Sequence, residues 1–365
     1  MKVGYFSPLA PARSGVADYS AALLDALGLL CDVSVGASDA DVCLYHLGNN
    51  QLHRGIYEQA LRRPGVVVLH DAVLHHFFLG LLDREAYIEE FVYNYGEFHR
   101  GQAALLWDAR AGSAQDPRYF DHAMVRRIAE ASRAVVVHNR AAARIVARHA
   151  PGARVVEIPH LFTPPALWEP DAARRWREQN SIGAGTFLFG VFGHMRESKR
   201  LYAVVEAFER ARRRDAAAAL LIAGDFASSD LERAAAPLVN APGVITVPYC
   251  PDRAFWALAS AVDVCVNLRY PSAGETSGIT IRLMGIGKPV LVSAGEETAE
   301  FPEDACIRID PGLAETAMVA EYMVWLSARP KLARGIGHRA AAHIAEHHSP
   351  AGVALRYFEL LSSCC

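Results

Sequence analysis

The feature that most constrains the fold is a repeated alternation between short, continuously apolar runs and longer amphipathic segments. In the first half of the chain, the runs at 2–6, 66–70 and 134–138 are KVGYF, VVVLH and AVVVH. Strands that are apolar at nearly every position are typical of parallel sheets covered by helices on both faces. We therefore expect an α/β fold built from strand–helix–strand units.

The same alternation starts again after residues 161–185, a stretch with three prolines that we interpret as the linker between two domains. We predict two doubly wound, Rossmann-like domains, which a chain of 365 residues can hold. The first covers residues 1–165, and the second covers residues 166–348. A last helix, about 349–365, is expected to pack back on the first domain. Such tandem sheets predict binding crevices that face each other across a cleft.

Composition excludes several classes of function. The 37 basic and 40 acidic residues give a net charge of −3, so no nucleic-acid partner is expected. No G-x-G-x-x-G follows a strand, which argues against an NAD enzyme. The seven cysteines show no zinc or C-x-x-C spacing, which fits a reducing cytoplasm. Without a signal peptide or an 18-residue apolar run, we expect a soluble cytoplasmic protein. Peripheral membrane contact and the oligomeric state stay open.

The most informative segment is residues 268–293, which predict a strand end, a loop and then a helix. Small residues at the helix start let a ligand approach unpaired backbone amides, a favourable place for a diphosphate. Glu275 in the loop can accept hydrogen bonds from sugar hydroxyls. A capped helix with a surface glutamate explains the same residues without a ligand. The candidate ligand-binding residues here are Thr276, Ser277, Gly278 and Ile279.

A second segment, residues 190–208, predicts a strand that ends at Gly193 and a helix that begins near Lys199. The chain has only four lysines, and a cation here can neutralise the charge that builds on a departing phosphate. We therefore expect Gly193, His194, Arg196 and Lys199 at the diphosphate. A solvated lysine at a helix start is the plain alternative.

The N-terminal half offers two further candidates. Gly15 ends a loop before a helix and permits close approach of a phosphate or an acceptor. His70 and Asp71 follow a buried strand, at the sheet edge where ligands bind. Asp71 either orients the imidazole or binds an acceptor hydroxyl. The plain alternative is a capping aspartate and a hydrogen-bonded core histidine. A metal site made of these two residues and His75 lacks the rest of a ligand set.

The segments at 190–208 and 268–293 resemble the donor sites of retaining group 1 glycosyltransferases with the GT-B fold. The run GETSG resembles a bacterial subgroup of that family. The resemblance implies that Glu275 and His70 contact the donor sugar, that Lys199 clamps the diphosphate, and that the loop ending at Gly15 faces the donor. It extends in element order over nearly the whole chain. On this resemblance, residues 1–165 are expected to be the acceptor domain and residues 166–348 the nucleotide-sugar domain.

The chain departs from the family at two positions. The resemblance implies a ribose-binding glutamate at position 282, where the chain has Arg282. This arginine either reaches a phosphate or covers the helix surface. The resemblance also implies an arginine at position 194, where the chain has His194, and Arg196 can substitute for it.

These observations predict a hexosyltransferase-type enzyme of polysaccharide or glycoconjugate biosynthesis. It would transfer a sugar from a UDP- or GDP-sugar to a saccharide, a lipid-linked saccharide or a small molecule. The resemblance implies retention and no metal or other cofactor. The Asp39-Ala40-Asp41 run precedes a strand, so we interpret it as a turn and not as a metal motif. The alternatives are a nucleotide-sugar 2-epimerase and a non-catalytic nucleotide-sugar-binding protein.

Overall fold

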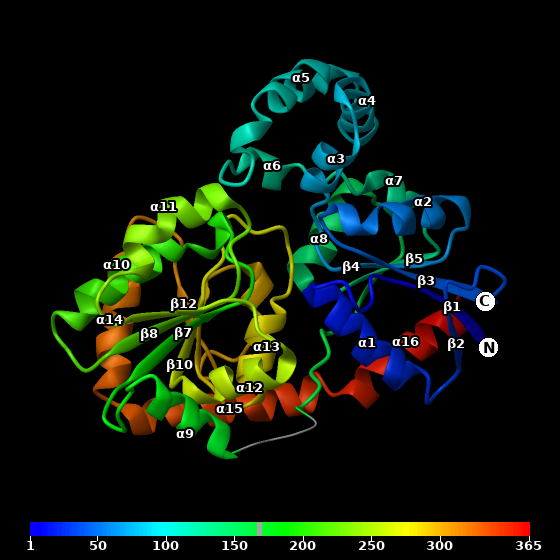
Figure 1. Ribbon diagram of the computed structural model, residues 1–365. Coiled ribbons are helices and arrows are strands. Elements are labelled where there is room, and N and C mark those ends of the chain that lie inside the picture. Colours follow the sequence, from blue (N-terminus) through cyan, green and yellow to red (C-terminus); the bar gives the residue numbers. More distant parts are fainter. Residues whose placement is uncertain (166–169) are drawn as a thin grey trace. The chain divides into compact units, whose positions relative to one another are not determined.

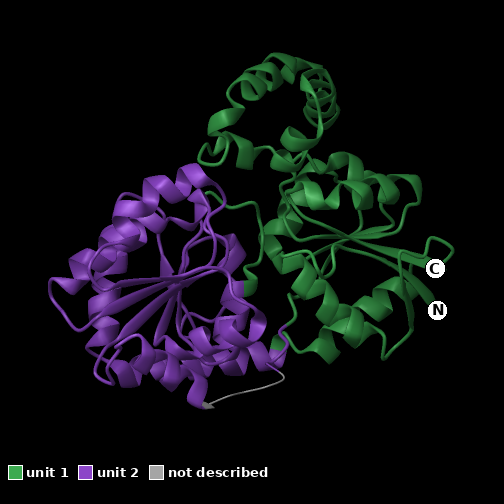
Figure 2. Ribbon diagram, viewed as in Figure 1, with its two compact units in different colours: residues 1–161, 271–278, 347–365 green, residues 162–270, 279–346 purple. Residues whose placement is uncertain are grey.

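The computed structural model describes residues 1–165 and 170–365. These residues form two compact units (Figure 2): residues 1–161, 271–278 and 347–365 make unit 1, and residues 162–270 and 279–346 make unit 2. Residues 166–169 of the predicted linker, and with them the predicted domain boundary at 166, lie outside the described residues. The acceptor and donor roles of the two domains stay predictions. In the described residues, no helix is long and apolar enough to cross a membrane.

Unit 1 contains a parallel sheet of six strands among its described residues, in the order β2-β1-β3-β4-β5-β6. The strands are β1 (Lys2–Phe6), β2 (Asp32–Val35), β3 (Val42–Leu47), β4 (Val66–Leu69), β5 (Ala134–Val137) and β6 (Val155–Glu157). The helices are α1 (Gly15–Leu27), α2 (Arg54–Arg62), α3 (His75–Leu81), α4 (Arg84–Tyr95), α5 (Arg100–Asp108), α6 (Arg118–Asp121), α7 (Arg126–Ala131), α8 (Arg140–His149) and α16 (Pro350–Ser362), with the 3-10 turns η1 (Gln51–His53), η2 (Glu97–His99) and η3 (Arg110–Gly112).

The apolar strands are explained by the two faces of this sheet. Alternate residues such as Val66 and Val68 pack with α1 and α16, whereas Val67 and Leu69 pack with α2, α7 and α8. Figure 1 shows α1 and α16 side by side, and the hydroxyls of Tyr19 and Tyr357 are 2.9 Å apart between them. The last helix therefore completes one face of the first sheet.

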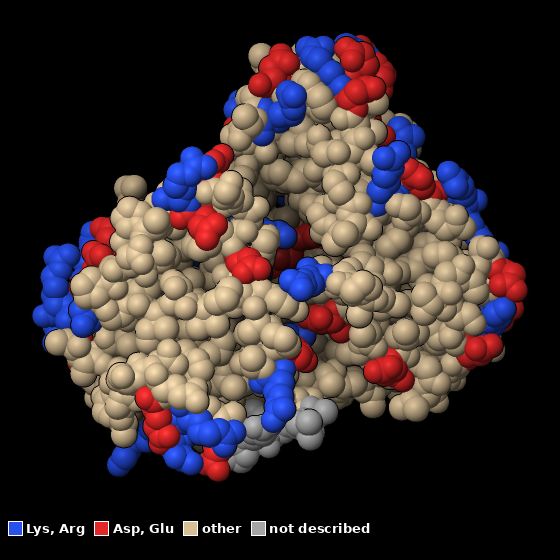
Figure 3. Space-filling model, viewed as in Figure 1, with Lys and Arg blue, Asp and Glu red and all other residues tan. Residues whose placement is uncertain are grey.

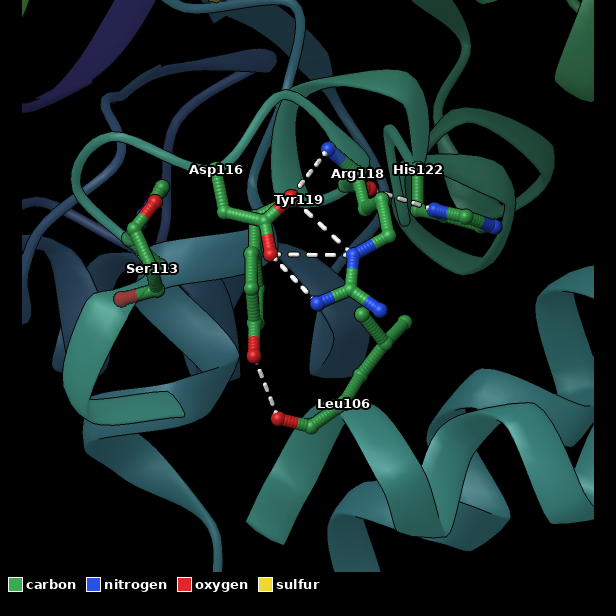
Figure 4. A network of polar contacts seen from close by, with 7 residues as sticks. Leu106, Ser113, Asp116, Arg118, Tyr119 and His122 are labelled. Atoms are coloured by element: carbon green, nitrogen blue, oxygen red, sulfur yellow. Dashed lines mark hydrogen bonds and ion pairs between the residues drawn. The ribbon is translucent and has the colours of Figure 1, made fainter. Parts of the chain in front are cut away.

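The predicted helical stretch after Asp71 folds as α3 to α7, which we call the cap. Polar contacts fix its connecting loop (Figure 4): Arg118 binds both carboxylate oxygens of Asp116, Tyr119 donates to the Leu106 carbonyl, and His122 Nδ1 donates to the Arg118 carbonyl over 2.6 Å. Over α4 and α5 the surface in Figure 3 carries acidic and basic side chains together. The cap therefore presents no field of one sign on that face.

Unit 2 also contains a parallel sheet of six strands in its described part, in the order β12-β11-β10-β7-β8-β9. The strands are β7 (Leu188–Phe192), β8 (Ala219–Ala223), β9 (Val244–Val247), β10 (Val264–Asn267), β11 (Val290–Ser293) and β12 (Ile307–Ile309). The helices are α9 (Pro170–Gln179), α10 (Leu201–Arg212), α11 (Ser229–Val239), α12 (Asp252–Ala261), α13 (Gly278–Gly285), α14 (Glu315–Ser327) and α15 (Pro330–His347), with the 3-10 turns η4 (Glu197–Lys199) and η5 (Glu296–Thr298).

Both faces of this second sheet are covered as well. Phe189 and Val191 pack with α10 and α14, whereas Leu188 and Phe192 pack with α12 and α13. The predicted fold class, α/β with two doubly wound parallel sheets, is confirmed.

Candidate functional site

The ligand-binding position of unit 2 follows from its strand order. The chain runs from β7 outward through β8 and β9, and then crosses to β10 on the other side of β7. Ligands of doubly wound sheets bind at such a switch point, at the carboxyl ends of the strands. Gly193 and His194 follow β7 there, and Asn267 ends β10.

Lys199 is buried at this switch point, with only 4% of its surface exposed. Its ammonium donates to the Phe192 carbonyl over 2.6 Å and to Asn267 Oδ1 over 3.2 Å. The amide of Asn267 in turn donates to Thr280 of α13 over 2.8 Å. The ends of β7 and β10 and the start of α13 thus hold one positive charge. The predicted alternative of a solvated lysine is therefore wrong.

Two glycines keep the backbone beside this charge uncovered. Gly193 and Gly224 have φ of 88° and 136°, values that favour glycine. A Cβ on Gly224 would lie 2.2 Å from the Gly193 carbonyl oxygen, so no side chain fits between β7 and β8 at this point. A Cβ on Gly193 would lie 3.4 Å from the Ile279 side chain and 3.6 Å from Lys199 Nζ. Gly193, Lys199 and Ile279 are therefore neighbours.

His194, Arg196 and Arg282 complete the predicted residues of unit 2. His194 and Arg196 are exposed; partial burial and the positive charges of Arg196 and Lys199 lower the pKa of His194, against the carboxylate of Asp225. Arg282 lies over the ring of Phe255, at 5.4 Å from its centroid, and 3.5 Å from the carboxylate of Asp252. Of the two roles left open for Arg282, these contacts match the covering of the helix surface.

The loop that carries Glu275 packs with unit 1, although β10 and α13 on either side of it belong mainly to unit 2. Its Ala273 carbonyl accepts hydrogen bonds from the amides of Ala72 and Val73, over 2.8 and 3.1 Å. Glu275 Oε2 accepts from the Ala273 amide over 2.8 Å, which closes a turn. Glu275, Thr276, Ser277 and Gly278 therefore group with the first sheet, and not with the rest of the predicted nucleotide-sugar domain.

Asn139 fixes the same loop from its other side. This residue is 2% exposed, and its Oδ1 caps α8 by accepting from the Ala142 amide over 2.8 Å. Its Nδ2 donates to the Gly274 carbonyl over 3.1 Å and to Thr276 Oγ1 over 2.9 Å. One side chain therefore joins a helix start to the loop that presents Glu275.

Asn139→Asp is expected to destabilise unit 1 by about 1–3 kcal/mol, because the new carboxylate keeps the cap but faces the Gly274 carbonyl without a proton to donate. Urea unfolding measures the loss, and limited proteolysis should show faster cleavage within residues 271–278. Thr276→Val, which removes only one acceptor, serves as the milder control. An Asn139→Asp protein as stable as the wild type would contradict the anchoring role.

Four histidines lie at the carboxyl edge of the unit 1 sheet, one at the end of each of the neighbouring strands β3, β4, β5 and β6 or shortly after it. His46 lies on β3, His70 follows β4, His138 follows β5 and His160 follows β6. The ring of Tyr19 from α1 lies 4.7 to 6.0 Å, centroid to centroid, from all four imidazoles. The sheet edge therefore brings together an aromatic cluster of which the sequence had indicated only His70.

His70 is held by this cluster, and the carboxylate of its neighbour Asp71 is bound elsewhere. The ring nitrogens of His70 lie 3.1 Å from His46 Nδ1 and 3.3 Å from His138 Nε2. Asp71 Oδ2 accepts from the Asn49 amide over 2.7 Å. Burial first, and then the neighbouring imidazoles of His138, His46, His160 and His53, lower the pKa of His70 well below its ordinary value.

Three other predictions can be compared with the structure. Gly15 is the first residue of α1, and a Cβ there would meet no atom within 4 Å, so packing does not require a glycine. Asp39 pairs with Lys2 at 3.1 Å and Asp41 accepts from the Lys2 amide, as a turn before β3 would. Among the described residues, no group of three or more His, Cys, Asp or Glu side chains is placed to hold a metal ion.

Sequence reasoning missed Asn139, Asn267, His46 and His138. For the histidines a signal was present, because the predicted strands at 66–70 and 134–138 both end in a histidine, and the strand-like segments at 41–48 and 153–160 also contain one at or near their carboxyl ends. In a parallel sheet those ends share one edge. The two asparagines carry no comparable signal, since their partners are distant in the sequence.

Comparison with solved structures identifies the fold. The chain is similar to HepE of Anabaena, solved with UDP and glucose, with 15% identity, full coverage of both chains and a TM-score of 0.67. It is similar to sucrose-phosphate synthase of Thermosynechococcus elongatus, with 17% identity over 99% of this chain and 98% of that one and a TM-score of 0.67. It is also similar to WaaG, a glycosyltransferase of lipopolysaccharide biosynthesis, with 13% identity over 97% and 98% and a TM-score of 0.60.

These likenesses establish that each unit has the Rossmann-like fold of a GT-B protein. No family model matches the sequence. A search of curated proteins also finds no significant match.

Proposed function

We propose that this protein is a glycosyltransferase that moves a sugar from a nucleotide diphosphate sugar to an acceptor hydroxyl. The observation that carries the proposal is the buried ammonium of Lys199 at the switch point of unit 2, beside the uncovered backbone of Gly193. A glycosidic bond to a diphosphate breaks more readily when a fixed cation stabilises the charge on the leaving oxygen. The amides at the start of α13 add donors for the same anion.

The solved relatives support a uridine donor. HepE was solved with UDP and with UDP-glucose, and WaaG is a glycosyltransferase. We therefore propose a UDP-sugar as the first donor to test and a GDP-sugar as the second. In the proposed reaction Glu275 contacts sugar hydroxyls, and the acceptor oxygen attacks the anomeric carbon while its proton passes to the leaving phosphate. The proposed outcome is retention without a metal.

The acceptor is proposed to be a saccharide, a lipid-linked saccharide or a small molecule, bound by unit 1 in the cytoplasm or at the membrane surface. The cap and Asp71 are the proposed acceptor contacts. The exposed surface of α4 and α5 carries both charges, including the pair of Arg100 and Glu89 at 2.7 Å. Such a mixed surface suits a neutral saccharide better than a highly charged one.

A thermal-shift screen of nucleoside diphosphates and their sugars tests donor binding, because a bound ligand stabilises the folded protein by mass action. Donor turnover is then followed with and without acceptors, with a chelator in every reaction. A sugar epimer formed without acceptor would support the 2-epimerase. Stabilisation by nucleotide without any turnover would support a binding protein. Activity that requires added metal would contradict the proposed metal-free chemistry.

Glu275→Gln is expected to lower kcat/KM at least about tenfold, since the carboxylate is replaced by a weaker acceptor for sugar hydroxyls. The fold should be kept, because the amide oxygen of glutamine can still accept from the Ala273 amide. Steady-state kinetics measure the loss, and thermal unfolding verifies the fold. Glu296→Gln, on the loop after β11, is the matched control. Wild-type rates in Glu275→Gln would remove this residue from the mechanism.

A further inference from the structure

The histidines at the carboxyl edge of the unit 1 sheet form a chain whose hydrogen positions can be deduced. His138 Nδ1 lies 2.9 Å from the Ile158 carbonyl oxygen, which can only accept, so this nitrogen carries the proton. A neutral imidazole has one N–H, so His138 Nε2 must accept, and its partner is His70 Nδ1. Which nitrogen is protonated is thus set by the bond that the other one makes.

The same argument continues along the chain. The only N–H of His70, on Nδ1, donates to His138. His70 Nε2 therefore accepts from His46 Nδ1 over 3.1 Å. All three imidazoles therefore have the proton on Nδ1. His46 is fully buried, and its Nε2 has no hydrogen-bond partner in the described residues. We call His46, His70 and His138 the relay.

Burial keeps the relay uncharged. The pKa of His138 is lowered to about 4 by burial, with a small opposing effect of the bond to the Ile158 carbonyl. The pKa values of His46 and His70 are also lowered well below the ordinary value, first by burial and then by neighbouring imidazoles. The groups that face the relay are the phenol of Tyr19 on α1, whose hydroxyl binds Tyr357, the phenol of Tyr5 on β1, and the imidazoles of His53 and His160.

The relay is not a metal site. The two nitrogens of His70 are on opposite sides of its ring, and each faces a different histidine. The nitrogens therefore do not converge on one point, which agrees with the absence of a metal-binding group in the described residues.

From this geometry we infer that His46 and His138 are positioning residues that act through His70. They hold its side chain in one orientation, as a neutral imidazole with no N–H to offer a ligand. An uncharged edge of this kind suits the hydroxyls and carbons of a sugar, and it does not attract a diphosphate as an imidazolium would. The inference rests on the proposed transfer reaction, in which His70 contacts the sugar.

Two substitutions of His138 separate positioning from simple packing. His138→Asn keeps a donor near the Nδ1 position for the Ile158 carbonyl but removes the acceptor of His70. His138→Gln keeps an acceptor near the Nε2 position but removes the donor. We expect His138→Asn to raise KM for the donor sugar roughly tenfold, the effect of about one hydrogen bond. It should also move the acid limb of the kcat/KM profile towards pH 6.5, because a released His70 titrates normally.

His138→Gln should stay within about threefold of the wild type, with an unchanged acid limb. His338→Gln, an exposed histidine of α15, is the control for histidine replacement. Equal losses in His138→Asn and His138→Gln with unchanged pH profiles would mean that His138 only packs, and would overturn the inference.

Nitrogen-15 NMR of histidine-labelled protein tests the relay independently of activity. Between pH 6.5 and 8, we expect the rings of His46, His70 and His138 to show a protonated Nδ1 and a bare Nε2. A protonated Nε2 on His70 would overturn the inference whatever the enzyme does. Three Nδ1–H rings in a protein without transferase turnover would contradict the proposed function and leave the relay standing.

Discussion

Lys199→Met is expected to lower kcat roughly 10²–10³-fold, the usual effect of removing one fixed group that stabilises a developing anion. The lysine is nearly completely buried, and its ammonium is held by the ends of β7 and β10. It is therefore already oriented before the substrate binds, and no energy of reorganisation is needed when the diphosphate departs. Single-turnover kinetics with saturating donor measure the chemical step directly.

The same substitution also affects stability, and Lys288 offers the matched control. Methionine at position 199 removes the hydrogen bonds that Lys199 donates to the Phe192 carbonyl and to Asn267 Oδ1, at a cost of about 1–3 kcal/mol each. Lys288 is also largely buried, with a pKa lowered by burial to about 8, and donates to the Ser260 and Val262 carbonyls over 2.7 Å. It precedes β11, at the amino end of the sheet and away from the switch point.

Lys288→Met should therefore lose a similar amount of stability and keep its turnover at temperatures where both variants are folded. Two proteins that are equally destabilised but differ about a hundredfold in kcat would assign the loss to the charge of Lys199. Equal kcat values would remove Lys199 from the chemistry and leave it a structural residue.

The sequence allowed the fold to be predicted because the evidence for it is local. Val66 to Leu69 are all buried, two on each face, so a run of apolar residues is enough to indicate a central parallel strand. The alternation of elements also located a strand end at Gly193 and a helix start near Lys199, whereas the switch point beside them follows only from the strand order of the folded sheet. The sequence pattern could not predict that the charge of Lys199 is buried. That orientation depends on its hydrogen bonds to the Phe192 carbonyl and Asn267 Oδ1.

The loop with Glu275 shows the other limit of sequence reasoning. Its residues lie between β10 and α13, so adjacency in the chain assigned them to the second domain. Their packing is decided instead by the Ala72 amide and the Asn139 side chain, which are more than 130 residues away. Long-range hydrogen bonds of this kind cannot be predicted from the periodicity of the sequence. The relay lies between these two cases. The position of each histidine near a strand end can be predicted from the sequence, but the tautomers follow only from the contact of His138 with the Ile158 carbonyl oxygen.

Acid is expected to destabilise unit 1 steeply between about pH 6.5 and 4. Burial, as the largest cause, lowers the pKa of His53 and His138 to about 4 and that of His75 to about 3, and it lowers those of His46 and His70 as well. In the unfolded chain these groups titrate near about pH 6.5. Below that pH the unfolded state binds protons that the folded state does not bind. The stability present above pH 6.5 is therefore lost as the pH falls towards the pKa values of the folded protein.

The expected slope is large because several histidines act together. Each buried neutral histidine removes about 1.4 kcal/mol per pH unit in this window, so five remove up to about 7, comparable with the whole stability of a typical domain. Glu90 acts in the opposite direction, since burial raises its pKa in spite of Arg127, but it is a single group. Urea midpoints by circular dichroism at pH 7.5, 6.5, 5.5 and 5.0 measure the slope.

His53→Asn should reduce that slope by about 1.4 kcal/mol per pH unit, because asparagine does not titrate. Its amide can replace His53 Nδ1 as the donor to the His46 carbonyl, a bond of 3.0 Å, so stability at pH 7.5 should change little. His338→Gln, which replaces an exposed histidine, should leave the slope unchanged. A flat stability profile from pH 7.5 to 5.0 in the wild type would mean that the buried imidazoles accept protons in the folded state, and the neutral relay would then be untenable.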